Sequence, residues 1–340
     1  MRRPQLLAAF IAFTLIVLAF PAAPQRRAAE APVKIDIAAQ TIDSFSPREP
    51  EQARFGPLEF RGGLQLTSSY REFGGLSALR VAADGARFVA LTDKGRWLTG
   101  RIVYDGKNRL RGIADATMAP MLGTDGRPLA ARGWYDTESI AEDGGTLYVG
   151  IERVNRIVRF DFGRLGVLAR GEPIALPPGV AKLPNNKGLE AMVFVPKGLP
   201  LAGTLIAMSE RGLDADGNIK AFLIGGPSPG EFSIKRSDDF DISDAALLPS
   251  GDLLLLERRF FWWSGVAMRI RRIRLATIAP GALVDGATLL FADMGYQIDN
   301  MEGLSVHRDA AGDTILTLVS DDNFSLIQRT ILLQFRLVEE

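Results

Sequence analysis

The sequence contains no cysteine and a single histidine. The missing cysteine excludes disulfide bonds, thiolate metal sites and a cysteine nucleophile. His307 lies in the stretch VHRDAAGD, which is typical of a surface turn, and no serine motif of the GxSxG type accompanies it. A catalytic triad that depends on histidine is therefore not expected.

Net charge is also missing, because 40 basic residues balance 40 acidic ones. A chain without net charge has no global field that attracts nucleic acid or an anionic membrane. Recognition by charge has to come from local groups, and nucleic acid is not expected as a partner.

One long apolar run stands near the N-terminus. Residues 6–20 read LLAAFIAFTLIVLAF and follow Arg2 and Arg3. A positive start before an apolar run that is short for a membrane span is typical of an export signal. Residues 1–23 are predicted to be a signal peptide or an uncleaved membrane anchor, so the protein is expected to be periplasmic, secreted or membrane-anchored. Residues 24–54, rich in Ala, Pro and Arg, are predicted to be a linker to a folded domain of residues 55–340.

Long helical periodicity is absent from the folded part. Short β-rich runs, punctuated by Gly, Asp and Pro, indicate a sheet protein. The runs come in couples, in which a turn and an acidic or hydroxyl residue precede a hydrophobic strand that ends near an acidic residue. Five couples are visible: GGLSAL with RFVALTDKGR, DTESIA with TLYVGIERVNR, GLEAMVFV with TLIAMSERG, ISDAALL with DLLLLERR, and MEGLSV with TILTLVSDDN.

The spacing of the couples predicts a β-propeller. With Leu76, Glu138, Glu190, Asp244 and Glu302 as anchors, the intervals are 62, 52, 54 and 58 residues, which suits one four-stranded blade per repeat. Residues 55–340 have room for five or six blades. The fold predicted here is an all-β, six-bladed propeller in which an N-terminal strand at 57–67 and a C-terminal strand at 328–337 close one blade.

Such a ring brings acidic residues together. The innermost strand of each blade faces the axis, so Glu138, Glu190, Asp244 and Glu302 are expected to converge. The neighbouring strands are expected to end at Asp93, Glu152, Glu210, Glu257 and Asp321.

Crowded carboxylates repel one another unless a cation joins them, and oxygen-rich sites suit divalent ions such as Ca²⁺. Glu138, Glu190 and Glu302 are the predicted catalytic residues. The predicted metal ligands are Asp93, Glu138, Glu190, Asp244, Asp299, Glu302 and Asp321.

Basic residues flank the acidic strand ends. A guanidinium or ammonium there is suited to holding phosphate oxygens, and the alternative is that the Glu-Arg pairs are structural salt bridges. The predicted substrate-binding residues are Lys94, Arg96, Lys187, Arg211 and Arg258. The aromatic stretch FFWW (260–263) is expected to pack between blades, with a substrate funnel or a partner surface as the alternative.

Several of these motifs together resemble the phytase-like family, described as having esterase-like activity of phytase and comprising exported bacterial β-propellers. The resemblance spans about residues 60–338 and is carried by ALTDKGRW, DTESIA, NKGLEAM, SDAALLPSGDLLLLERRF, IDNMEGLSV and LVSDDNFSLIQRTILLQF. It implies a propeller fold, hydrolysis of phosphate esters such as phytate, and calcium bound by acidic residues.

The predicted function is a metal-dependent hydrolase of phosphate esters, phytase-like or esterase-like, with calcium as the expected ion. Two alternatives stay open: a non-catalytic periplasmic binding propeller, and a lactonase-like hydrolase with one central metal ion. The expected partner is a small-molecule phosphate ester or other ester. A membrane is expected only through an uncleaved N-terminal anchor, and the protein is expected to be a monomer.

Overall fold

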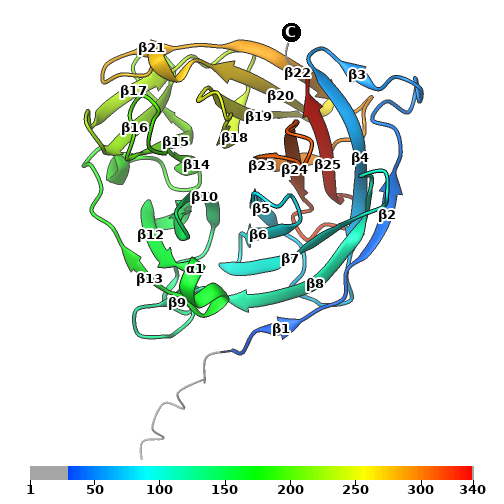
Figure 1. Cartoon of the computed structure of the whole chain (residues 1–340). Coiled ribbons are helices and arrows are strands. Elements are labelled where there is room, and N and C mark those ends of the chain that lie inside the picture. Colours follow the sequence, from blue (N-terminus) through cyan, green and yellow to red (C-terminus); the bar gives the residue numbers. More distant parts are fainter. Residues whose placement is uncertain (1–29, 339–340) are drawn as a thin grey trace, which may run out of the picture.

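The computed structural model of the protein describes residues 30–338, and the expected signal peptide or anchor lies outside this range. Five sheets are arranged around one axis, as Figure 1 shows. Their pairing is antiparallel except where the short outer strands β9 (Leu122–Gly123) and β21 (Leu283–Val284) pair in parallel. The fold is therefore an all-β propeller. No helix within residues 30–338 is long and apolar enough to cross a membrane.

Each blade begins with a strand at the axis and continues outward by antiparallel pairing. The inner strands are β5 (Leu76–Val81), β10 (Thr137–Asp143), β14 (Leu189–Phe194), β18 (Asp241–Leu247) and β23 (Asn300–Arg308). The second strands are β6 (Arg87–Thr92), β11 (Thr146–Ile151), β15 (Thr204–Leu213), β19 (Leu253–Phe261) and β24 (Thr314–Asp321). We number blades 1 to 5 in this order.

The outer part of each blade is less regular. The third strands are β7 (Arg96–Tyr104), β12 (Arg156–Asp161), β16 (Ile219–Gly225), β20 (Gly265–Ile273) and β25 (Thr330–Leu337). The fourth strands are β8 (Leu110–Pro120), β13 (Arg170–Pro173), β17 (Gly230–Ile234), β22 (Ala287–Asp293) and β4 (Leu58–Thr67). Short strands add to the outer edges: β1 (Val33–Lys34), β9 (Leu122–Gly123), β21 (Leu283–Val284), β2 (Ala38–Ile42) and β3 (Arg54–Phe55).

Helical segments are short and lie in the connections. They are α1 (Phe162–Leu165) and the 3₁₀ turns η1 (Leu129–Arg132), η2 (Glu152–Val154), η3 (Gly166–Leu168), η4 (Val180–Lys182) and η5 (Leu275–Thr277).

The prediction of six blades is wrong, because the described chain forms five. The N-terminal strand β4 does not begin a further blade. It pairs with the C-terminal strand β25, with Phe60 opposite Phe335, and so completes blade 5. This pairing covers the edge of β25 and closes the ring between the two ends of the chain. Each couple in the sequence thus corresponds to one blade, and no sixth inner strand exists in residues 30–338.

Part of the segment predicted as a linker packs on the propeller. Strand β1 pairs with β8, and β2 pairs with β4. Phe45 is fully buried, with its ring centroid 5.0 Å from that of Phe335. The described portion of residues 24–54 therefore contributes to blades 1 and 5.

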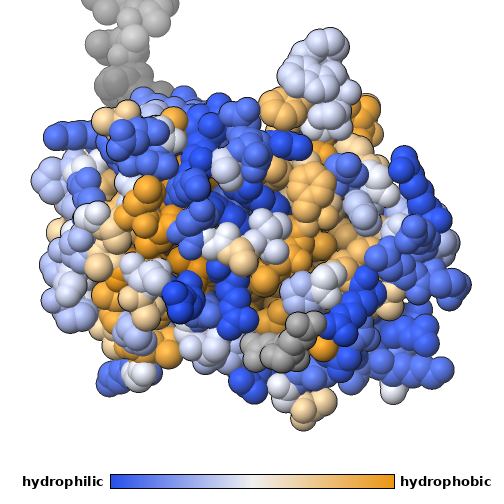
Figure 2. Space-filling model, turned by 90° about the horizontal axis from the view of Figure 1, so that it is seen from above, coloured by the Kyte–Doolittle hydropathy of each residue, from blue (hydrophilic) through white to orange (hydrophobic). Residues whose placement is uncertain are grey.

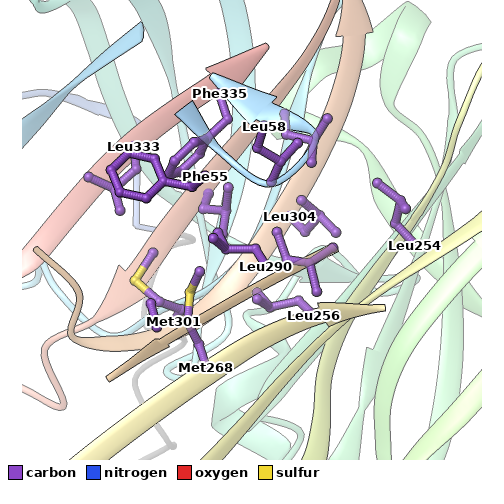
Figure 3. Packing of buried hydrophobic residues seen from close by; sticks show 14 of the residues in the cluster. Phe55, Leu58, Leu254, Leu256, Met268, Leu290, Met301, Leu304, Leu333 and Phe335 are labelled. Carbon is purple, nitrogen blue, oxygen red and sulfur yellow. The ribbon is translucent and has the colours of Figure 1, made fainter. Parts of the chain in front are cut away.

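Apolar side chains fill the spaces between neighbouring blades, and the buried residues form five clusters. Figure 3 shows one of them, in which Leu333 and Phe335 of blade 5 lie near Leu256 and Met268 of blade 4. The inner and second strands are largely buried, and the second strands carry the longer apolar runs, such as LLLL at the start of β19.

A single arginine occupies the axis. Nη1 and Nη2 of Arg80, on β5, donate hydrogen bonds to a backbone carbonyl of every inner strand. The five carbonyls belong to Leu79, Ile140, Met192, Ala245 and Leu304. These residues hold equivalent positions in the five strands, so one planar cation joins all blades at one level.

Asp244 balances the charge of Arg80. Its carboxylate lies 3.0 and 3.2 Å from the two terminal guanidinium nitrogens and also accepts a hydrogen bond from the backbone N–H of Leu304. Asp244 is fully buried. Charges in such a place are tolerated only when they are paired and hydrogen-bonded, and this pair meets both conditions.

Replacing Arg80 is expected to destabilise the ring strongly. Arg80→Met leaves Asp244 buried without its cation and removes the donors for five carbonyls, so the free energy of unfolding should fall by about 3–5 kcal/mol. Urea denaturation followed by circular dichroism measures this loss.

Two variants serve as controls. Arg87→Met removes an exposed ion pair with Asp84 and is expected to leave the unfolding midpoint unchanged. Adding Asp244→Asn to Arg80→Met should recover part of the lost stability, because the unpaired charge is gone. An Arg80→Met protein as stable as the wild type contradicts the role given to this arginine.

Candidate functional site

Every inner strand carries a β-bulge at the same place. The register with the second strand shifts by one residue, and the extra residues are Ser77, Glu138, Glu190, Ser243 and Glu302. A bulge leaves one residue out of the pairing and re-aims its side chain. Glutamates from blades 2, 3 and 5 therefore occupy equivalent positions around the axis.

A second ring of equivalent positions lies where the second strands reach the same end of the blades. Each residue of this ring lies opposite the residue that is two positions before the bulge residue of the same blade. The five residues are Asp93, Glu152, Glu210, Arg258 and Asp321. Four are acidic, and Arg258 is the single cation of this ring.

The register corrects the sequence alignment at three positions. In blade 1 the bulge residue is Ser77, one position after the anchor Leu76, and the other two corrections are in blade 4. Asp244 follows the bulge residue Ser243 by one position and contacts Arg80 at the axis. Glu257 precedes Arg258 by one position and is fully buried, with Arg269 and Arg271 as ion-pair partners. Because successive strand residues point to opposite faces, a shift of one residue removes both carboxylates from the rings.

The remaining acidic residues form what we term the carboxylate cluster: Asp93, Asp136, Glu138, Glu152, Glu190, Glu210, Glu302 and Asp321. Oxygens of Glu152, Glu190 and Glu210 lie within 4.8 Å of one another. Glu138 interacts electrostatically with Glu302, and Glu302 with Asp321. The three predicted catalytic glutamates thus meet in one place, together with the strand-end acids.

Arg258 reaches into the cluster. Its Nη2 lies 3.3 Å from Glu302, 3.5 Å from Glu210 and 3.8 Å from Glu190. Its Nη1 donates to the Oδ1 atom of Asn300, whose Nδ2 donates in turn to Glu302. The guanidinium of Arg258, which belongs to blade 4, therefore contacts carboxylates of blades 3 and 5.

Lys187 is the second cation in direct contact, with Nζ 2.7 Å from Oε2 of Glu210. Lys94 lies nearby over the ring of Phe324, 3.0 Å from its centroid. Burial raises the pKa of Asp93, and the charge of Lys94 offsets part of that rise. Cations are fewer than carboxylates throughout the cluster.

Burial is the main reason that the carboxyl groups of the cluster resist ionisation. It raises the pKa of Glu152 to about 7, with Glu210 adding to the shift. It raises the pKa of Asp321 to about 8 and that of Asp93 to about 6, in both cases with a contribution from Glu302. The pKa values of Glu138, Glu190 and Glu302 are raised for the same reason.

The other predicted site residues are engaged elsewhere. Asp299 accepts the backbone N–H of Arg329 and lies 3.5 Å from its Nε. Arg96 pairs with Glu30 and Glu72. Arg211 pairs with Asp241, so for this arginine a structural salt bridge, the alternative to substrate binding, describes the contact.

The donor set of the cluster fits a hard divalent cation. Oxygens around Ca²⁺ lie at 2.3–2.6 Å, so two oxygens of one shell are at most about 5 Å apart. The oxygens of Glu152, Glu190 and Glu210 satisfy this limit. Oδ1 of Asp93 is buried and has no hydrogen-bond partner among the described residues, so its lone pairs are available to coordinate a cation.

Several important residues were not selected from the sequence. Asp136 lies directly before β10, and in the sequence it stands in the turn at the start of DTESIA, where an aspartate is not distinctive. Glu152 and Glu210 were recognised as strand ends, yet only the fold shows that they face Glu190. Arg80 gave no signal, since an arginine in an apolar strand is not distinctive by itself.

These features define the class of protein: a five-bladed propeller with a buried carboxylate cluster at one end of its axis. The chain belongs to the phytase-like family. The family model described as "Phytase-like: Esterase-like activity of phytase" matches residues 71–324. The family indicates a hydrolase of phosphate esters, and the resemblance found in the sequence is confirmed. No curated protein matches the sequence significantly.

Similar solved structures are distant. The PQQ-bound aldose sugar dehydrogenase from Streptomyces coelicolor has 14% identity and a TM-score of 0.43, over 84% of this chain and 99% of that one. A hypothetical protein from Leishmania major has 9% identity and a TM-score of 0.41, over 78% and 86%. YCF48 bound to D1 peptide has 11% identity and a TM-score of 0.35, over 78% of this chain and 66% of that one. Similarity at this level bears on no functional question.

The raised pKa values predict an unusual dependence of stability on pH. The folded protein keeps protons on Asp93, Glu152 and Asp321 up to about pH 6 to 8, whereas the unfolded chain releases them near their ordinary values of 3.8 and 4.5. The folded state thus binds more protons in this window, and the free energy of unfolding must fall as the pH rises through it.

Thermal unfolding between about pH 5 and pH 8 tests this expectation. With a chelator present, the melting temperature should drop by roughly 5 °C or more towards pH 8. Added Ca²⁺ should reverse much of the drop, because a cation replaces the protons. A melting temperature that rises with pH in the chelated protein contradicts the prediction.

Proposed function

We propose that the protein is a metal-dependent hydrolase of phosphate esters and that the carboxylate cluster is its active site. The observation that carries this proposal is the meeting of bulge glutamates with strand-end acids in a buried place that has few cations. Structural ion pairs do not explain such an excess of like charges. Membership in the phytase-like family supports the same reaction class.

Calcium is the proposed ion, held by Glu152, Glu190 and Glu210, with Asp93, Glu138, Glu302 and Asp321 as further oxygen donors nearby. When bound, such an ion neutralises the charge of phosphate oxygens and lowers the pKa of a water molecule. Asp244 and Asp299 are not part of this set, because Arg80 and Arg329 are their partners.

The protein's own residues supply orientation and proton transfer. Arg258 and Lys187 are partly accessible, with 27% and 38% of their side chains exposed, and are placed to hold phosphate oxygens. Asp321 lies outside the three proposed calcium ligands, and burial raises its pKa to about 8, so it can exchange protons near neutral pH. This suits the protonation of a leaving alcohol oxygen. Glu138, Glu190 and Glu302 are the proposed catalytic residues.

One observation favours a second candidate function. Arg258 contacts Glu190, Glu210 and Glu302 by itself, which partly neutralises the cluster without any ion. A binding propeller that holds a small polar ligand without hydrolysis is consistent with this contact. The number of ions in the purified protein separates the candidates, since a lactonase-like site holds one central ion and a binding module needs none.

Replacing Glu302 tests the hydrolase proposal. Glu302→Gln keeps the shape of the side chain but removes its charge, and the rate of phosphate ester hydrolysis should fall by roughly a hundred-fold or more. A chelator should reduce the wild-type rate similarly, and added Ca²⁺ should restore it. Phytate and a chromogenic phosphate monoester are suitable substrates.

Glu142→Gln is the matched control, because Glu142 is exposed at the far end of the inner strand that carries Glu138. Its activity should equal that of the wild type. Hydrolysis that survives both the chelator and Glu302→Gln excludes the proposed mechanism. Bound calcium without hydrolysis of either substrate favours the binding propeller.

A further inference from the structure

The aromatic stretch FFWW lies on the surface, contrary to the expected packing between blades. It forms the tip of the β19–β20 hairpin, in which Phe260, Trp262 and Trp263 are 68%, 83% and 66% exposed. The ring of Trp263 stacks on Phe261 at 4.8 Å between centroids and meets Trp262 edge to face at 5.6 Å. Contacts among Phe261, Trp262 and Trp263 therefore order these side chains, although no core residues cover them.

The hairpin lies on the face of the disc that carries the carboxylate cluster. In every blade the turn between the second and third strands is at this end, which we term the upper face. The corresponding turn of blade 5 exposes Leu326 and Ile327 almost completely. Figure 2 shows hydrophilic atoms over much of the edge of the disc, orange patches between them, and one projection of pale atoms beside orange ones. Large apolar side chains that are exposed together mark contact sites.

The N-terminal part of the chain joins the propeller at the same face. Glu30 pairs with Arg96, at 2.7 Å, and Arg96 begins β7 directly after the upper turn of blade 1. The apolar run of residues 6–20 ends only ten residues before Glu30. Ten residues span at most about 35 Å, so an apolar run held in a bilayer keeps the upper face close to it.

We propose that the upper face docks on a lipid bilayer through the β19–β20 hairpin. Tryptophan side chains are favoured at the interface between lipid headgroups and acyl chains. Two exposed cations on the same face, Lys94 and Arg153, are placed to meet headgroup phosphates. The carboxylate cluster then lies at the end of the propeller that faces the membrane. This inference does not depend on the hydrolase proposal.

Quenching of tryptophan fluorescence by brominated lipids tests the docking. The full-length protein is mixed with vesicles of phosphatidylcholine and phosphatidylglycerol, with and without bromine on the acyl chains. Two of the four tryptophans are on the hairpin, and Trp97 is fully buried, so emission should fall by roughly half with brominated lipid. Trp262→Phe with Trp263→Phe should abolish most of this decrease.

Control variants separate quenching that arises at the hairpin from vesicle binding through the N-terminal run. Leu283→Ser changes a residue that is 59% exposed on the outer strand β21, and quenching should be unchanged. Leu326→Ser with Ile327→Ser should weaken quenching. Vesicle-bound protein with equal emission in both lipids overturns the proposal. So does self-association without lipid that Trp262→Ser with Trp263→Ser abolishes, because the hairpin then binds a second copy.

Discussion

The arrangement of Arg80 at the axis is the constraint on which the rest of the molecule depends. The N–H donors of a planar guanidinium reach acceptors only at hydrogen-bond distance, and carbonyls of all five inner strands accept hydrogen bonds from Arg80. The strands are thereby fixed at the same level and at the same distance from the axis. Each bulge residue lies two positions before the residue that supplies the carbonyl, so the same contact sets the height of Glu138, Glu190 and Glu302.

This rigid ring makes a costly cluster possible. Buried carboxylates that repel one another would separate if their strands were free to move. The five apolar clusters between the blades hold the strands in place. The like charges therefore remain together and are relieved by protons, by Arg258 and Lys187, or by a bound cation. Sites that work against stability in this way are typical of functional regions.

Blade 4 differs from the others in a way that suits this balance. Its positions in the two rings are Ser243 and Arg258, where the neighbouring blade 3 has Glu190 and Glu210. Its own carboxylates are used for structure, since Asp244 pairs with Arg80 and Glu257 pairs with Arg269 and Arg271. One blade thus contributes a cation to the site while its acids stabilise the fold.

The sequence by itself determined the sheet composition, the five couples with one blade each, the shared blade of the two chain ends and the convergence of Glu138, Glu190 and Glu302, because hydrophobic pattern and repeat spacing are local properties. Only the tertiary structure decided that the ring has five blades rather than six, that Asp244 and Glu257 turn away from the site, and that Trp262 and Trp263 are exposed. A strand alternates its faces at every residue, so a bulge that only pairing reveals reverses the direction of each side chain beyond it.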